Sequence, residues 1–180
     1  MKEFNGKVAL VTGAAHGIGH AFSKEAAERG MKLALVDIDE PALNQVAEEL
    51  RGLNAEVLVC VTDVSVYEEA KASVQATMEQ FGQIDVLFAN AGIATAGSSH
   101  NSIWEWAMAV NTMGIVHYVH EVLPIMEAQK TPAHLMCTAS IAGLRAGMAV
   151  NPPYFASKHA AVSVAESVKA EVESTGCDIG

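Results

Sequence analysis

The chain has 180 residues, 51% of them hydrophobic and 18% charged, which is typical of a folded globular protein with a single core. Its 21 acidic and 11 basic residues give a net charge of −10, which argues against nucleic-acid partners because phosphate backbones require clustered Lys and Arg. No apolar run approaches the ~20 residues that span a bilayer, and the N-terminus lacks a signal peptide's long apolar middle. We therefore expect a cytoplasmic protein without a membrane partner.

Short β-branched runs alternate along the chain with longer segments of helical periodicity. Nearly continuous apolar runs of this kind indicate parallel strands that are covered on both faces. The pattern predicts an α/β fold, a doubly wound, Rossmann-like parallel sheet with helices on both faces. The predicted strands are 7–12, 32–37, 56–62, 84–90 and 133–140, the clearest helices are 41–50, 66–81 and about 154–174, and Gly30, Gly52 and Gly82 stand where helices should end.

The chain ends on what resembles the beginning of a further strand. After Gly176 it continues with Cys177-Asp178-Ile179 and then stops. Because a compact domain rarely ends on the first residues of a strand, we expect the sequence to be incomplete at its C-terminus and to lack further strands.

A glycine-rich turn, TGAAHGIGHAF, follows the first predicted strand directly. Gly13 and Gly17 suit a tight turn in which a pyrophosphate meets backbone N–H groups at a helix N-terminus, and Gly19 allows close packing of helix on strand. His16 and Ile18 belong to the same turn. The sequence therefore predicts a dinucleotide-binding turn, with an ordinary strand-to-helix turn as the alternative.

An acidic residue, Asp37, ends the second predicted strand, 18 positions beyond Gly19. In a dinucleotide fold an acid at about this spacing accepts hydrogen bonds from the adenosine ribose and repels a 2′-phosphate, so NAD is favoured over NADP. A protonated His16 would offset part of this repulsion. A loop-facing acid, or a cap for the helix near Pro41, is the alternative for Asp37.

Further candidate residues follow the other strands, where ligands of open parallel sheets bind. Asp63 and Val64 follow the third strand, and Asp63 can accept a hydrogen bond from an adenine amine. Residues 90–92 (Asn90, Ala91 and Gly92) bring small groups and backbone close to a cofactor, and Ser140 follows the fifth strand. Each of these residue types is also common after strands for reasons of turn geometry.

Tyr154 and Lys158 lie four positions apart, just past a double proline in VNPPYFASKH, and share one face of a helix. A tyrosine of ordinary pKa near ~10 is a poor base at pH 7, but a neighbouring ammonium favours the phenolate. The pair therefore predicts a tyrosine that acts as a general acid and base.

Taken together and in this order, TGAAHGIG, Asp63, NAG at 90–92, Asn111, Ser140 and YFASK at 154–158 resemble the short-chain dehydrogenase/reductase family. The resemblance implies that Tyr154 exchanges the proton with a substrate alcohol or ketone. It implies that Lys158 lowers the pKa of this tyrosine and holds the nicotinamide ribose, that Ser140 orients the substrate oxygen, and that Asn111 anchors a water of a proton relay. Hydride transfer itself is chemistry of the NAD cofactor.

By this resemblance, residues 1–180 form a single dinucleotide-binding and catalytic domain of an NAD-dependent oxidoreductase. Members of the family are usually longer and continue into further strands and a substrate loop, which this sequence does not contain. The alternatives are a non-catalytic dinucleotide-binding sensor or structural protein and, less favoured, a family member that catalyses epimerisation or dehydration.

Other features carry less weight. His117 and His120 lack an obvious third ligand, so we predict a packed or solvent-facing pair and no metal site. Cys60, Cys137 and Cys177 are odd in number and widely spaced, which favours reduced thiols, with Cys60 and Cys137 filling the core. By the same resemblance, the helical segments 103–126 and 154–170 are candidates for a homodimer or homotetramer interface, with simple packing on the sheet as the alternative. Loops 93–100 and 144–151 are expected to shape the substrate pocket and hint at an apolar substrate body.

Overall fold

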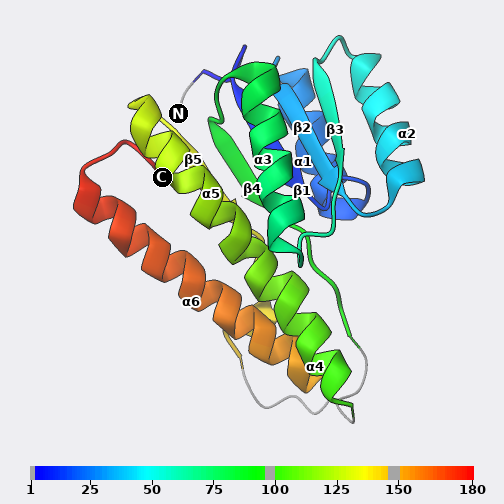
Figure 1. Cartoon of the computed structure of the whole chain (residues 1–180), viewed down its shortest axis with the longest axis vertical. Coiled ribbons are helices and arrows are strands. Elements are labelled where there is room, and N and C mark those ends of the chain that lie inside the picture. The colour runs from blue at the N-terminus through cyan, green and yellow to red at the C-terminus, as the bar shows by residue number, and fades with distance from the viewer. Residues whose placement is uncertain (1–2, 96–99, 146–150) are drawn as a thin grey trace.

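A computed structural model describes residues 3–95, 100–145 and 151–180, and their strands form one parallel sheet. The strand order is β3-β2-β1-β4-β5, so chain order reverses between β1 and β4. Figure 1 shows the carboxyl ends of the strands meeting at one edge of the sheet. This confirms the predicted fold class. The strands are β1 (Val8–Thr12), β2 (Lys32–Asp37), β3 (Val57–Val61), β4 (Val86–Ala89) and β5 (His134–Cys137).

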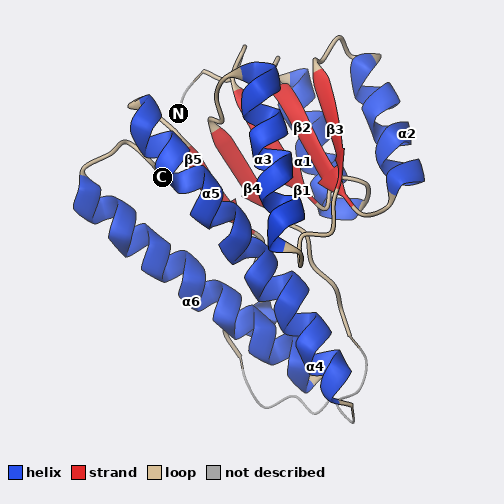
Figure 2. Ribbon diagram, viewed as in Figure 1, coloured by secondary structure: helices blue, strands red, loops and turns tan. Residues whose placement is uncertain are grey.

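Helices cover both faces of the sheet (Figures 1 and 2). Helices α1 (Gly17–Glu28) and α2 (Glu40–Arg51) lie on one face, and α3 (Tyr67–Phe81) and α5 (Gly114–Gln129) lie on the other. Helix α4 (Asn101–Met108) leads into α5, and α6 (Pro152–Thr175) lies outside α5 and reaches α4.

Side chains alternate between the two faces of the sheet, and each face has its own hydrophobic core. Leu10, Val36 and Leu87 point toward α3 and α5, whereas Val11 and Leu35 point toward α1 and α2, and all five are fully buried. Strands that are buried on both faces appear in the sequence as continuous apolar runs. This explains why the strands could be located from the sequence.

The start of one helix and the backbone conformation at the end of another differ from the prediction, although α2 does end at Gly52 as expected. Helix α6 begins at Pro152, because Asn151 caps it and prolines are tolerated in a first turn, where the missing N–H needs no partner. Gly52 is not a left-handed helix end. Its φ is −61°, and the positive φ after α2 falls instead on Asn54, a residue type that adopts this conformation readily.

The long helical segment expected at 103–126 contains a π-helical stretch, Ala109–Met113, between α4 and α5. Such wide turns often occur at functional sites. Asn111, predicted as a site residue, lies within it and is fully buried.

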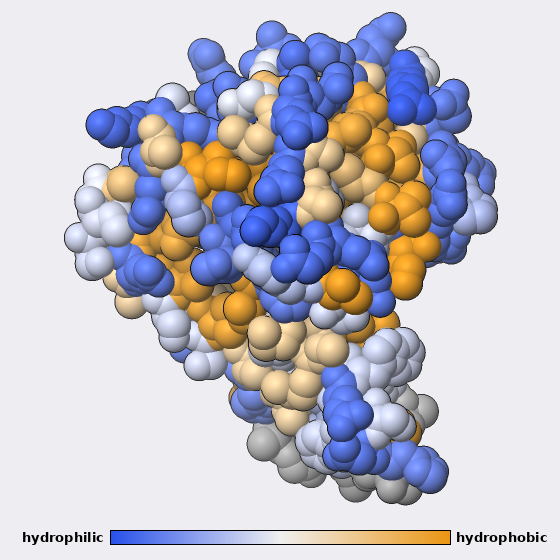
Figure 3. Space-filling view, viewed as in Figure 1, coloured by the Kyte–Doolittle hydropathy of each residue, from blue (hydrophilic) through white to orange (hydrophobic). Residues whose placement is uncertain are grey.

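The predicted start of a further strand is present as a single parallel bridge between Ile179 and Ala133. Between β5, α5 and α6 lies a second cavity of about 270 Å³ that includes Val119, Val168 and Ile179 in its wall. Figure 3 shows apolar side chains gathered along the groove between α5 and α6.

Among the described residues, no helix combines the length and apolar character needed to cross a bilayer.

The glycine-rich turn joins β1 to α1 at very close range. A Cβ on Gly19 would collide with the carbonyl of Gly13 and lie 2.7 Å from Asn90 Nδ2. This confirms that the third glycine of the motif permits α1 to pack on the end of β1.

We predict that Gly19→Ala lowers the free energy of unfolding by about 3 kcal/mol or more, because the methyl group meets rigid backbone. Gly176→Ala is the control: its φ is 71° but a Cβ would meet nothing within 4 Å, so we expect a loss of about 1–2 kcal/mol. Urea unfolding measures both variants. A loss at Gly19 no larger than the loss at Gly176 would contradict the close approach of α1 to the end of β1.

Candidate active site

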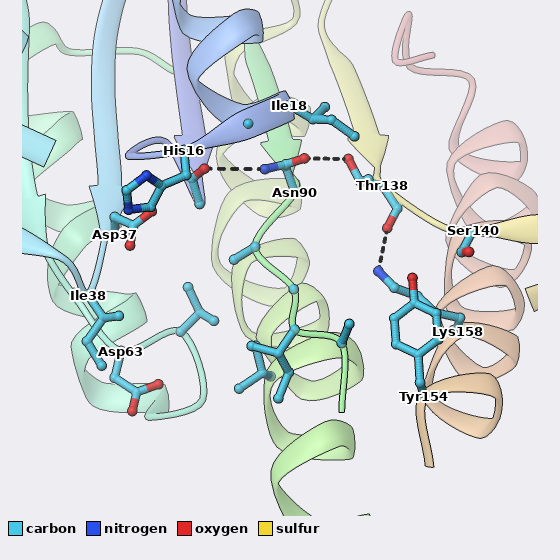
Figure 4. Close-up of a pocket in the computed structure, with 18 of the residues that line it drawn as sticks. His16, Ile18, Asp37, Ile38, Asp63, Asn90, Thr138, Ser140, Tyr154 and Lys158 are labelled. Carbon is cyan, nitrogen blue, oxygen red and sulfur yellow. Dashed lines mark hydrogen bonds between the residues drawn. The ribbon is translucent and has the colours of Figure 1, made fainter. Parts of the chain in front are cut away.

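A cavity of about 690 Å³ lies at the carboxyl ends of the strands. This is where open α/β sheets bind ligands, at the point where the strand order reverses. Every predicted site residue except Gly19 and Asn111 contributes to its wall. Figure 4 shows His16 and Asp37 at one end, Tyr154, Lys158 and Ser140 at the other, and Asn90 and Thr138 between them.

The glycine-rich turn forms the floor of the cavity beside α1. Gly13 and Gly17 have φ values of 68° and 52°, which other residues adopt only with strain. His16 is the N-cap residue of α1, and no side chain of the described chain caps its first-turn N–H groups. These N–H groups, together with the positive end of the helix dipole, fit a pyrophosphate.

Asp37 lies at the end of β2 and lines the cavity. Its Oδ2 accepts a hydrogen bond from Ala15 N at 3.0 Å and its Oδ1 accepts one from Asp39 N at 3.1 Å, which holds the carboxylate in place. Each carboxylate oxygen retains acceptor capacity for a ribose hydroxyl. Asp37 is not the cap of α2; Asp39 accepts the hydrogen bond of Ala42 N at 3.2 Å and has that role.

Asp63 and Val64 form the wall next to β3. Asp63 Oδ1 accepts hydrogen bonds from the backbone N and the hydroxyl of Ser65, at 2.9 and 2.6 Å. Val64 is buried, and its carbonyl oxygen lies 3.0 Å from Nδ1 of His117. His117 is thus half-buried and packed, whereas His120 is exposed. The described residues hold no group of three or more His, Cys, Asp or Glu side chains suited to a metal ion.

Asn90 connects three strand ends. Its Nδ2 donates to the carbonyl of Thr12 at 3.0 Å, and its Oδ1 accepts from the hydroxyl of Thr138 at 3.0 Å. The hydroxyl of Thr12 in turn accepts from the backbone N–H groups of Asn90 and Ala91. The side chain of Asn90 therefore links the strand ends below the cavity, and the methyl group of Ala91 and the absence of a side chain at Gly92 leave room above them.

Tyr154 and Lys158 lie on one face of α6, as their spacing predicts. Lys158 is 3% exposed, and its ammonium donates a hydrogen bond to the Thr138 carbonyl at 2.9 Å. Its Nζ lies 5.9 Å from the centre of the Tyr154 ring, and both side chains line the cavity (Figure 4). Burial lowers the pKa of Lys158, and the nearby Cys137 thiol partly offsets this.

Ser140 stands across the cavity end, at the start of a short 3-10 turn (Ile141–Gly143). Its Oγ accepts a hydrogen bond from Ala142 N at 3.2 Å. This contact uses the oxygen as an acceptor, so the hydroxyl proton remains available as a donor to a substrate oxygen.

Asn111 lies behind the cavity wall. Its Oδ1 accepts from Ile93 N at 2.7 Å, and its Nδ2 donates to the Ile93 carbonyl and to Ser157 Oγ, both at 3.0 Å. A Cβ on Gly92 would lie 3.2 Å from Asn111 Oδ1 and 3.3 Å from Lys158 Nζ. Asn111 and Lys158 therefore flank the same glycine.

Several residues of the site were not predicted from the sequence. Thr138 and Ser157 supply the polar contacts of Lys158 and Asn111, and nothing in their local sequence sets them apart from other small polar residues. Trp106, to which no function was assigned, lines the cavity and is 54% exposed. Parts of the predicted substrate loops, 96–99 and 146–150, lie outside the described residues.

The three cysteines are free thiols. Cys60 and Cys137 pack against the core on the α3 and α5 side, as expected for core-filling residues. Burial raises the pKa of Cys60 to about 11 and also raises the pKa of Cys137, although the Lys158 ammonium opposes the latter shift. Neither thiol therefore has the low pKa of a reactive cysteine.

Comparison with known proteins agrees with this geometry. Residues 7–180 match the family model for short chain dehydrogenases. A CLA biosynthesis dehydrogenase/reductase of Lactiplantibacillus plantarum is 44% identical over 99% of this chain and 63% of its own length. An uncharacterized oxidoreductase of Listeria innocua is 33% identical, over 96% of this chain and 70% of its own.

Among solved structures, a short chain dehydrogenase/reductase from Burkholderia phymatum, crystallised in complex with NAD, superimposes with a TM-score of 0.97. It is 42% identical and covers 100% of this chain, which spans 65% of the Burkholderia chain. The fold and the position of the site thus define an α/β protein with a doubly wound parallel sheet. The chain belongs to the short-chain dehydrogenase/reductase family.

We predict that the stability of Lys158→Met relative to the wild-type chain depends on pH. Because burial lowers the pKa of Lys158 from 10.5, its ammonium destabilises the folded state at neutral pH. This penalty disappears as the pH rises toward and past 10.5, so the free energy of unfolding of the wild type should rise relative to the variant between pH 7 and 10.5.

Urea unfolding at several pH values measures this difference. Lys169→Met, at a side chain that is 75% exposed, controls for the loss of one surface charge. A wild-type-to-variant difference that stays constant or moves the other way with pH would contradict the assignment of a desolvated lysine.

Proposed function

We propose that the protein is an oxidoreductase that transfers a hydride between NAD(H) and a secondary alcohol or ketone, with Tyr154 as general acid and base. One observation carries the proposal. Tyr154, Lys158 and Ser140 line the same cavity as the glycine-rich turn and Asp37 (Figure 4). The cavity thus combines the groups that suit a dinucleotide with those that suit proton transfer.

The wall of the cavity offers each part of the cofactor a suitable partner. First-turn N–H groups of α1, at Gly17 and Ile18, would bind the pyrophosphate, and Asp37 would accept the adenosine ribose hydroxyls. Asp63 and Val64 would border the adenine. Tyr154 and Lys158 would bind the nicotinamide ribose, and the bound cofactor supplies the hydride acceptor or donor.

Proton transfer is assigned to Tyr154 and its neighbours. In alcohol oxidation the Tyr154 oxygen takes the hydroxyl proton, and the Lys158 ammonium, held by the Thr138 carbonyl, stabilises the negative charge on that oxygen. The Ser140 hydroxyl keeps its proton and donates a hydrogen bond to the substrate oxygen, which stabilises the charge that develops there. In ketone reduction the same groups act in reverse.

Asn111 is proposed to complete a proton relay. Its amide oxygen accepts one hydrogen bond, from Ile93 N, which leaves a second lone pair. Because Asn111 Oδ1 and Lys158 Nζ both lie next to Gly92, a water bound between them could pass protons from Lys158 toward solvent.

The cofactor preference and the substrate class are also proposals. Asp37 and the NAD complex of the related Burkholderia structure support NAD over NADP. Trp106, Val110 and Ile93 line the cavity and support a substrate with an apolar body. The expected cytoplasmic location and a homodimer or homotetramer formed through segments 103–126 and 154–170 remain part of the proposal.

We predict that Tyr154→Phe lowers kcat by about 10³-fold, within the range that general acid–base catalysis contributes. The affinity for NAD should fall by less than about tenfold, because phenylalanine keeps the ring and its packing and loses only one hydrogen bond to the nicotinamide ribose. NADH formation at 340 nm with a panel of secondary alcohols measures turnover, and titration of NADH fluorescence measures binding.

Tyr118→Phe is a matched control, since Tyr118 is fully buried and bonded to Ser73 outside the cavity. Turnover by Tyr154→Phe at the wild-type rate would rule out the proposed mechanism. Tight NADH binding by the wild type without turnover of any alcohol or ketone would favour the non-catalytic alternative.

A further inference from the structure

His16 and two carboxylates meet at the adenosine end of the cavity. The Nε2 of His16 lies 2.9 Å from Oδ2 of Asp39, and Asp37 lies beside them at the end of β2 (Figure 4 shows His16 next to Asp37). His16 and Asp37 line the cavity, whereas Asp39 is the N-cap residue of α2 and is not part of the cavity lining. This end therefore holds two acids and one imidazole.

Asp39 has two separate contacts. Its Oδ1 accepts from Ala42 N at 3.2 Å and caps α2, while its Oδ2 binds His16. The hydrogen bond from His16, and then that from Ala42, holds the pKa of Asp39 below its usual value, so the carboxylate is ionised at neutral pH. The cap and the imidazole contact use different oxygens, so one can be changed without the other.

The remaining charges near His16 are engaged elsewhere or are acidic. On α1, His20 and Lys24 both contact Glu49 of α2, and Glu40 is an exposed acid in the first turn of α2. Of the residues that line the cavity, His16 and Lys158 are the basic ones, and Lys158 is bonded to Thr138 at the opposite end. Among the described residues that line the cavity, His16 is thus the basic side chain available to a phosphate on the adenosine ribose.

We propose that Asp39 is a specificity-determining residue that excludes 2′-phosphorylated dinucleotides by binding His16. The contact withdraws the imidazole that would otherwise meet the 2′-phosphate, and the carboxylate adds negative charge close to Asp37. This inference rests on the proposed dinucleotide function. In this proposal two carboxylates disfavour NADP: Asp37 acts directly, and Asp39 acts by binding His16.

The test compares adenosine 5′-monophosphate with adenosine 2′,5′-bisphosphate, using calorimetric titration so that no turnover is needed. Asp39→Asn is the informative variant, because asparagine caps a helix as well as aspartate does but lacks the charge. Glu40→Gln removes one charge from the neighbouring residue of the same helix turn and is the matched control. Circular dichroism and thermal unfolding check that α2 is intact.

We expect Asp39→Asn to improve the affinity for the bisphosphate, relative to the monophosphate, by about tenfold, and Glu40→Gln to change this ratio by less than about twofold. In the double variant His16→Gln/Asp39→Asn the relative affinity for the bisphosphate should improve by only about threefold, because the imidazole is no longer there to bind the phosphate.

An equal change in Asp39→Asn and Glu40→Gln would overturn the proposal, as would a gain in the double variant equal to that in Asp39→Asn. If the wild type binds the monophosphate and Asp39→Asn fails to improve bisphosphate binding, this inference fails while the proposed function stands. If the wild type binds neither nucleotide nor NAD, both fail together.

Discussion

The hydrogen bond between the Lys158 ammonium and the Thr138 carbonyl is the contact on which the site depends. A buried ammonium is costly unless it has a hydrogen-bond partner, and Lys158 is 3% exposed. The carbonyl at the end of β5 is that partner, and the contact therefore holds α6 against the sheet edge at one register. Tyr154, one turn earlier on α6, takes its position in the cavity from this contact.

The same contact continues into the rest of the sheet. The hydroxyl of Thr138 bonds Asn90, and Asn90 bonds the carbonyl of Thr12, so β5, β4 and β1 are linked at their carboxyl ends. Thr12 directly precedes Gly13 of the glycine-rich turn. A displacement of α6 would thus reach the turn through the side chains of Lys158, Thr138 and Asn90. The groups proposed for proton transfer and those proposed for dinucleotide binding therefore share one rigid support.

A second set of contacts locks α6 from its other side. Ser157 is fully buried; its hydroxyl accepts from Asn111 and its carbonyl accepts from Thr112, both in the π-helical stretch. The wider turn of a π-helix allows these two adjacent residues both to contact α6. Lys158 faces β5 while Ser157 faces the π-helical stretch, so successive residues of α6 are fixed in two directions.

Local sequence signals explain why part of this arrangement was predictable. The spacing of Gly13, Gly17 and Gly19 reflects backbone conformation and close packing, and the four-residue spacing of Tyr154 and Lys158 reflects helix geometry. Both act over a few residues and can be read directly. The sheet followed from apolar runs because parallel strands are buried on both faces.

Contacts between distant segments could not be read in this way. Thr138 is hydrogen-bonded to Lys158, 20 positions away in the sequence, and to Asn90, 48 positions away. Ser157 is hydrogen-bonded to Asn111, 46 positions away. Threonine and serine are common in many settings, so their partners emerge only once the sheet brings strand ends together. The contact of His16 with Asp39 was missed for the same reason, although both residues stand at helix starts that the sequence does indicate.

The charge distribution of the cavity explains how a chain with a net charge of −10 can suit an anionic dinucleotide. Asp37 and Asp63 lie where the proposed ligand offers hydrogen-bond donors, the ribose hydroxyls and the adenine amine. At the pyrophosphate position the α1 N-terminus offers backbone N–H groups in place of basic side chains. Surface charges more than about 8 Å away are screened at physiological salt, so the local donors outweigh the overall charge. The acidic composition that argues against nucleic acid, which needs an extended basic surface, is therefore compatible with a ligand whose two phosphates fit a single helix end.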